Sequence, residues 1–187
     1  VKDPKKLLIN DIDAIITAIR AASYGDNIES SIVCPACDHE NTFKVNVQYA
    51  LESMSFLDAE YVINLDSGLS LYIAPYKFTE SMKALHAQFE QNKLAKIMES
   101  DVTEEEKRIQ LGITFKILAK TNFDLICSSV VKIVNESAGI NVTNPEHITE
   151  FVRNTDSATS TAIEKLIQTI NKIGIEREFK ATCEKCS

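Results

Sequence analysis

Two cysteine pairs constrain this chain more than any other feature. The first pair is Cys34-Pro-Ala-Cys37 and the second is Cys183-Glu-Lys-Cys186, so most of the sequence lies between them. In each pair two residues separate the cysteines, a spacing at which two thiolates on one tight turn reach the same metal ion. Short β-prone runs, residues 28–33 and 175–181, lead into the two pairs. The sequence therefore predicts the two halves of one ribbon, brought together by whatever the intervening chain builds.

One structural zinc ion per chain is the interpretation that these thiols favour. Four thiolate ligands are typical of a closed structural site, whereas catalytic zinc keeps an open position. Closing a loop of about 150 residues costs on the order of 5 kcal/mol. Structural zinc returns on the order of 10 kcal/mol or more. We therefore expect the metal ligands to be Cys34, Cys37, Cys183 and Cys186.

Three alternatives to the shared site stay open at this point. The two pairs can bind metal separately, or one of them can be a coincidence. His39, two residues after Cys37, can replace a cysteine as a ligand. A redox role is the third alternative, although neither pair sits at the head of a helix after a strand, as thioredoxin-like proteins require.

The composition bounds the class of protein. The chain has 187 residues, of which 44% are hydrophobic and 25% charged, and its formal net charge is −7. An acidic chain argues against nucleic acid as the main partner, because such binders need a basic face. An odd number of cysteines in short pairs fits a reducing compartment. No apolar run approaches the ~18 residues of a membrane span, so we expect a soluble protein made in a cytosol.

Local patterns predict a helix and two hairpins in the first part of the chain. Apolar residues recur at helical spacing over 10–24, where Gly25 follows. Residues 42–47 alternate apolar and polar side chains and form the return strand of the first hairpin. Residues 61–65 and 69–73 alternate in the same way around Asp66-Ser67-Gly68, which predicts a second hairpin.

Residues 79–173 are predicted to be helical throughout. Thr79 and the capping box of Thr103 with Glu106 mark two helix starts. A break is expected near 121–122, with a further helical face over 123–134. Asn144 followed by Pro145 opens a short helix, and residues 157–172 form the last one.

The fold class predicted from these elements is α+β and mostly helical. Residues 1–76 plus 175–187 would form a small antiparallel β zinc-ribbon module from both chain ends, together with the N-terminal helix and both hairpins. Residues 77–174 would form an inserted helical bundle.

The sequence offers no catalytic or cofactor-binding constellation. Cys127 lies on an apolar helical face and is interpreted as a core cysteine. His86 and His147 are isolated in helical segments, and no glycine-rich phosphate loop is present. The sequence therefore predicts a protein that is not an enzyme.

Several stretches together resemble a known family. Residues 7–25 lead into Ser31-Ile-Val-Cys-Pro-Ala-Cys37, then a strand, a hairpin, and Leu71-Tyr-Ile-Ala-Pro-Tyr-Lys-Phe-Thr79 opening the helical region. This order resembles the T4-like bacteriophage baseplate hub and hub-assembly proteins, which have a zinc-ribbon-like cysteine set. One departure is that only Ser187 follows the second pair, so its closing strand is absent from this sequence.

The resemblance implies a structural or assembly component of a contractile phage tail baseplate, in its hub region. Its partners would be other tail and baseplate proteins, in a symmetric multi-copy assembly without nucleic acid. It would be found in the host cytoplasm during assembly and in the virion tail baseplate. The alternative is a cytosolic zinc-ribbon adaptor or regulator that binds a protein or a nucleic acid.

Overall fold

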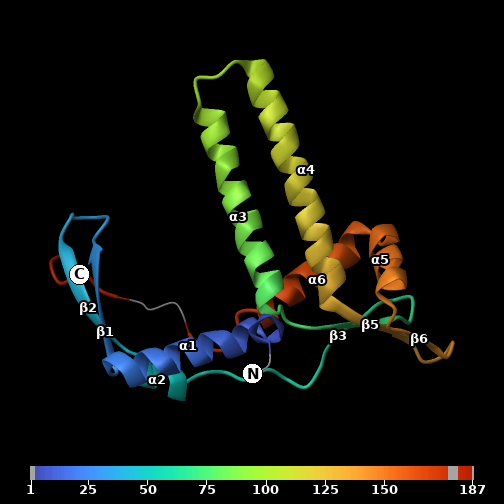
Figure 1. The fold of residues 1–187 in the computed structure, drawn as a ribbon, viewed down its shortest axis with the longest axis horizontal. Helices are drawn as coiled ribbons and strands as arrows, with labels where there is room; N and C mark the ends of the chain where they lie inside the picture. Colours follow the sequence, from blue (N-terminus) through green and yellow to red (C-terminus); the bar gives the residue numbers. More distant parts are fainter. Residues whose placement is uncertain (1–2, 177–180, 187) are drawn as a thin grey trace. The chain divides into compact units, whose positions relative to one another are not determined.

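The computed structural model describes residues 3–176 and 181–186, and they fall into two compact units. Unit 1 combines Val1–Ile9 with Asp58–Asn171, and unit 2 combines Asn10–Leu57 with Lys172–Ser187. Each unit is thus built from segments that are far apart in the sequence. The fold is α+β and mostly helical, with small antiparallel sheets, as predicted. Figure 1 shows the elements in chain order.

Unit 1 is organised around a four-stranded antiparallel sheet. The strands are β3 (Tyr61–Asn64), β4 (Ser70–Ile73), β5 (Val130–Asn135) and β6 (Ile140–Val142), and they lie in that order. Helix α5 (Pro145–Asn154) packs against β5, and α6 (Ser157–Ile170) packs against β4. The core between these layers contains Leu71, Ile73, Leu125, Ile126, Val130, Ile133, Ile148, Val152, Ile163, Ile167 and Ile170.

The prediction that residues 79–173 are helical throughout was wrong over 130–142. The run Val130-Val131-Lys132-Ile133-Val134 is β-branched apart from its lysine, and such residues lose rotamer freedom in a helix but pack well on a sheet. Gly139, with a φ of 66°, occupies the left-handed region in the turn that follows. The apolar residues of 130–134 were expected on a helical face. They lie instead in strand β5, which pairs with β4.

The second hairpin was predicted to belong with the cysteine module, but it forms part of unit 1. Strands β3 and β4 and the Asp66–Gly68 turn are present, with Gly68 at a φ of 78°. Because β4 also pairs with β5, this hairpin is covered by the sheet and helices of unit 1. The division between the units accordingly lies near residues 57–58, in place of the predicted 76–77.

Two long helices of unit 1 form an antiparallel hairpin. Helix α3 covers Phe78–Glu99 and α4 covers Glu104–Ser129, and the two pack side by side (Figure 1). Helix α4 is continuous for 26 residues, so the predicted break near 121–122 is absent. At its start the side chain of Thr103 accepts from Glu106 N–H at 3.3 Å, and Glu106 accepts from Thr103 N–H at 3.0 Å. The predicted capping box is therefore confirmed.

The first nine residues complete unit 1. After the short 3₁₀ helix η1 (Pro4–Lys6), Leu8 bridges Lys77 in antiparallel fashion. Ile9 N–H donates to Tyr76 O at 2.9 Å, and Phe78 N–H donates to Leu7 O at 2.9 Å. These backbone bonds hold the segment beside the start of α3.

Unit 2 contains α1 (Ile9–Tyr24, of which only Ile9 belongs to unit 1), β1 (Asn27–Val33), β2 (Glu40–Asn46) and α2 (Val47–Glu52). Strands β1 and β2 form the predicted first hairpin, in register from Asn27↔Asn46 to Val33↔Glu40. The β-prone run at 175–181 falls mostly on residues 177–180, which lie outside the described residues. The predicted helix at 10–24 is present, but Ile15, Ile16 and Ile19 on its apolar side are exposed.

Along the described residues, no helix combines the length and the apolar character that a membrane span requires.

Candidate metal centre

The first cysteine pair lies on the turn that joins β1 to β2. Cys34 N–H donates to His39 O at 2.8 Å, and Asp38 N–H donates to Cys34 O at 2.9 Å. Asp38 has a φ of 54°, in the left-handed region that a short polar side chain tolerates. These bonds close a tight turn in which Cys34 and Cys37 project to the same side, as the two-residue spacing predicts.

The four cysteines of the two pairs lie together, all in unit 2. Their Sγ atoms all fall within 4.8 Å of one another. Cys34 Sγ is 3.6 Å from Cys186 Sγ, and Cys37 Sγ is 3.7 Å from Cys183 Sγ. Zinc–sulfur bonds of about 2.3 Å in a regular tetrahedron place the sulfurs about 3.8 Å apart. The cluster therefore has the dimensions of a tetrahedral tetrathiolate site, and none of its members is in a disulfide.

Asn41 connects the two halves of this cluster. It is the second residue of β2 and only 3% exposed. Its Nδ2 group donates to His39 O at 3.0 Å and lies 3.6 Å from Cys183 Sγ. Its Oδ1 atom accepts from Glu184 N–H at 2.9 Å. One amide thus holds the second turn against the first, a role that the sequence analysis missed.

Backbone donors favour thiolates at two of the four sulfurs. The N–H groups of Lys185 and Cys186, with the Asn41 amide, lower the pKa of Cys183 to about 6. The N–H groups of Ala36 and Cys37 lower the pKa of Cys34. Contact with the neighbouring thiols Cys37, Cys34 and Cys183 raises the pKa of Cys186 to about 12. Thiolates are therefore favoured at Cys183 and Cys34, whereas Cys186 keeps its proton until a bound cation displaces it.

Among the described residues, the other candidates from the sequence contribute no ligand atom to this cluster. His39 contributes its backbone carbonyl, while the metal-sized group among the described residues consists of the four cysteines. Cys127 lies in α4 of unit 1, where burial raises the pKa of its thiol. His86 Nε2 lies 4.0 Å from Glu90 Oε1, both on α3.

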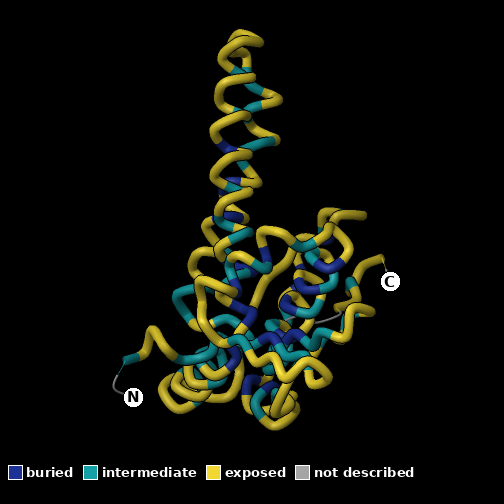
Figure 2. The backbone as a smooth tube through the Cα atoms, turned by 90° about the vertical axis from the view of Figure 1, so that its right-hand side faces the viewer, coloured by how far each residue is buried: buried dark blue, intermediate teal, exposed yellow. Residues whose placement is uncertain are grey.

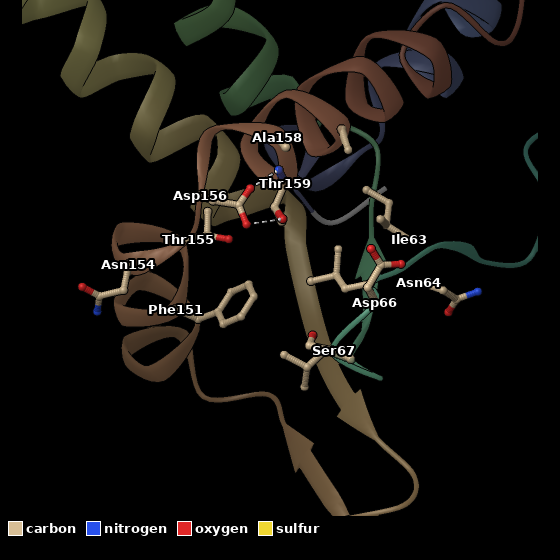
Figure 3. Close-up of a pocket in the computed structure, with 13 residues that line it drawn as sticks. Ile63, Asn64, Asp66, Ser67, Phe151, Asn154, Thr155, Asp156, Ala158 and Thr159 are labelled. Atoms are coloured by element: carbon tan, nitrogen blue, oxygen red, sulfur yellow. Dashed lines mark hydrogen bonds between the residues drawn. The ribbon is translucent and has the colours of Figure 1, made fainter.

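A separate cavity of about 630 Å³ lies in unit 1, between the β3–β4 turn and the junction of α5 and α6 (Figure 3). The Phe151 ring points into it, and Asp66 and Asp156 stand at its wall. Asp156 accepts from Thr159 N–H at 2.7 Å, which caps α6 and lowers the pKa of the carboxyl. Because this carboxylate is already bonded to the helix, we assign the cavity no chemistry.

The geometry defines a small two-unit α+β protein with a tetrahedral cluster of cysteines. Compared with known families, residues 1–187 match the model of a family described as T4 bacteriophage base plate protein. The chain therefore belongs to the T4 bacteriophage base plate protein family, and the predicted resemblance is confirmed. The searches of curated proteins and of solved structures found no significant match.

Family membership indicates the role, partners and location of the protein. A base plate family supports a structural role in a phage tail, with other phage tail proteins as partners. It points to a location in the virion tail baseplate and to a protein without catalytic function.

Proposed function

We propose that this protein is a structural or assembly component of the hub region in a contractile tail baseplate. It acts through shape-complementary contacts with other baseplate proteins, in a symmetric multi-copy arrangement. It joins the particle from the host cytoplasm. The observation that carries this proposal is the family match over residues 1–187.

One structural zinc ion holds unit 2 together in this proposal. Its ligands are Cys34, Cys37, Cys183 and Cys186, whose sulfur separations suit tetrahedral thiolate coordination. When bound, the ion supplies a rigid cross-link between the β1–β2 turn and the residues near the C-terminal end. Unit 2 then keeps one shape.

Metal analysis tests the zinc site. We expect one zinc per chain in the purified protein, and loss of the metal after either Cys34→Ser or Cys186→Ser. Cys127→Ser is the matched control, since this thiol lies in unit 1, and it should retain a full equivalent. Full zinc retention in either ligand variant would reject a single shared ion.

Affinity purification from infected cells tests the assembly role. We expect hub and baseplate proteins at a fixed copy ratio. The alternative, a zinc-ribbon adaptor or regulator, predicts host or viral regulatory partners, or nucleic-acid binding that weakens steeply with salt. Recovery of nucleic acid without any tail protein would overturn the proposed function.

A further inference from the structure

The α3–α4 hairpin exposes large apolar side chains that an isolated helix pair would be expected to bury. Exposed residues on α3 include Leu85 and Phe89, and those on α4 include Ile109, Ile113 and Ile117. The spacing of four residues in each set places its members on one side of their helix. The buried positions in the shaft of the hairpin are Ala87, Glu90 and Thr114. Several large apolar side chains therefore lie outside the contact between the two helices, while Leu94, Leu111 and Leu118 are half-buried.

Apolar residues of both helices meet along one side of the hairpin. A groove of about 500 Å³ between the helices is lined by Lys93, Ile97, Ile113 and Ile117, among others. Lys93 Nζ lies 5.0 Å from the centre of the Phe89 ring, so the α3 side chains continue to the edge of this groove. We call this surface the hairpin face. It comprises Phe89, Lys93, Ile97, Val102, Ile113 and Ile117.

Charge is separated along the hairpin. The tip, residues 99–108, carries five carboxylates and two basic side chains. The shaft, residues 82–98 and 109–123, carries five lysines and one glutamate. Of the lysines, only Lys93 has an ion-pair partner within 4.0 Å among the described residues. The shaft is thus basic although the protein as a whole is acidic. The acidic tip and the basic shaft of the hairpin have complementary charges.

We propose that two copies of this chain pack their hairpin faces together in antiparallel orientation, as a four-helix bundle. In this orientation the acidic tip of each copy lies over the lysines of the other. A two-fold axis repeats each contact, so the contact between an acidic tip and a basic shaft occurs twice in the dimer. A parallel arrangement would bring tip against tip and place like charges together. Figure 2 shows that most of the hairpin is exposed in the single chain, so the surface is free for a second copy.

This proposal concerns unit 1 alone and depends neither on zinc nor on the hub assignment. A negative result for the dimer would therefore not contradict the proposed function. The metal experiments, in turn, do not test the dimer.

Sedimentation analysis of the full chain at micromolar concentrations tests the dimer. We expect twice the mass of one chain for the wild type. Ile113→Glu should weaken association by about tenfold or more, because a charge replaces a side chain that the proposed contact buries. Phe115→Glu is the matched control. The two residues are 57% and 58% exposed and lie two positions apart on α4, so they point to different sides. Circular dichroism should show unchanged helix content for both variants.

Photo-crosslinking tests the orientation. With benzoylphenylalanine in place of Glu105, a mixture of isotope-labelled and unlabelled chains should give cross-links from the tip to shaft residues of the other copy. Links from tip to tip would overturn the antiparallel arrangement. A monomeric wild type, or equal loss of association in the Ile113 and Phe115 variants, would overturn the hairpin face. Association only with an acidic helix of another tail protein would overturn the second copy as its occupant.

Discussion

At the scale of single residues, Asn41 decides how the two cysteine pairs meet. Its amide bonds the first turn through His39 O and the second through Glu184 N–H, and contacts the sulfur of Cys183. The sequence does carry a signal for it. Alternation along β2 places Asn41 on the same side as Phe43 and Val45, so a polar residue occupies an inward position. Such a residue needs hydrogen-bond partners when buried, and these partners are the two turns.

We predict that Asn41→Ala lowers zinc affinity by about 10–100-fold, the usual effect of losing a hydrogen bond to a metal ligand. Competition with a chromogenic chelator would measure it. Thr42→Ala is the control, because Thr42 is exposed on the other side of β2, and its side chain lies 3.2 Å from Ser31 Oγ. Equal affinities for the two variants would show that Asn41 does not support the site.

At the scale of elements, the helix starts show which capping residues could be predicted from the local sequence. Thr103 and Asn144 were predicted as caps and are caps, each accepting a backbone N–H at the start of its helix. Thr79 was also predicted as a cap, but α3 begins at Phe78 after Lys77, which makes no side-chain capping bond. The backbone bond from Phe78 to Leu7 O brings α3 into contact with the N-terminal segment. A distant segment therefore moved this boundary.

We predict that Thr103→Ala destabilises the first turn of α4 by about 1 kcal/mol, since it leaves helix N–H groups without a partner. Hydrogen exchange of the amides at the start of α4 would measure the loss. Thr79→Ala should change the exchange at the start of α3 much less, because this residue is inside the helix. A larger effect at Thr79 than at Thr103 would contradict the observed caps.

At the scale of the whole molecule, each unit closes around segments from distant parts of the chain. Unit 2 joins its parts through the cysteine cluster and through the backbone bond from Ser55 N–H to Gly174 O at 3.0 Å. Unit 1 has its own apolar core between the sheet and its helices. Because unit 2 buries few apolar residues, its stability should depend on the metal far more than that of unit 1 does.

Zinc removal should therefore act on one unit. After chelation we expect faster hydrogen exchange across 27–46, where β1 and β2 lie, and little change in β4, β5 and α6. Restoring zinc should restore the protection. Uniform loss of protection across both units would show that they do not unfold separately, and unchanged exchange in β1 and β2 would contradict a structural role for the metal.

What the sequence determined by itself is mainly local. The two cysteine turns, the β1–β2 hairpin, the capping box at Thr103 and the cap at Asn144 all depend on residues a few positions apart. Side-chain size, hydrogen-bonding groups and backbone preference act at that range, so a short stretch contains the whole cause. The cysteine spacing also predicted which four thiols belong together.

Only the tertiary structure decided the contacts between distant segments. It paired β4 with β5, with Ser70 opposite Val134, and turned a predicted helical stretch into a strand. It placed Cys34 beside Cys186 and Cys37 beside Cys183, with Asn41 between the turns. It also left the hairpin face uncovered. The physical reason is that burial and sheet pairing depend on which surfaces meet, and a residue's neighbours in sequence do not specify its neighbours in space.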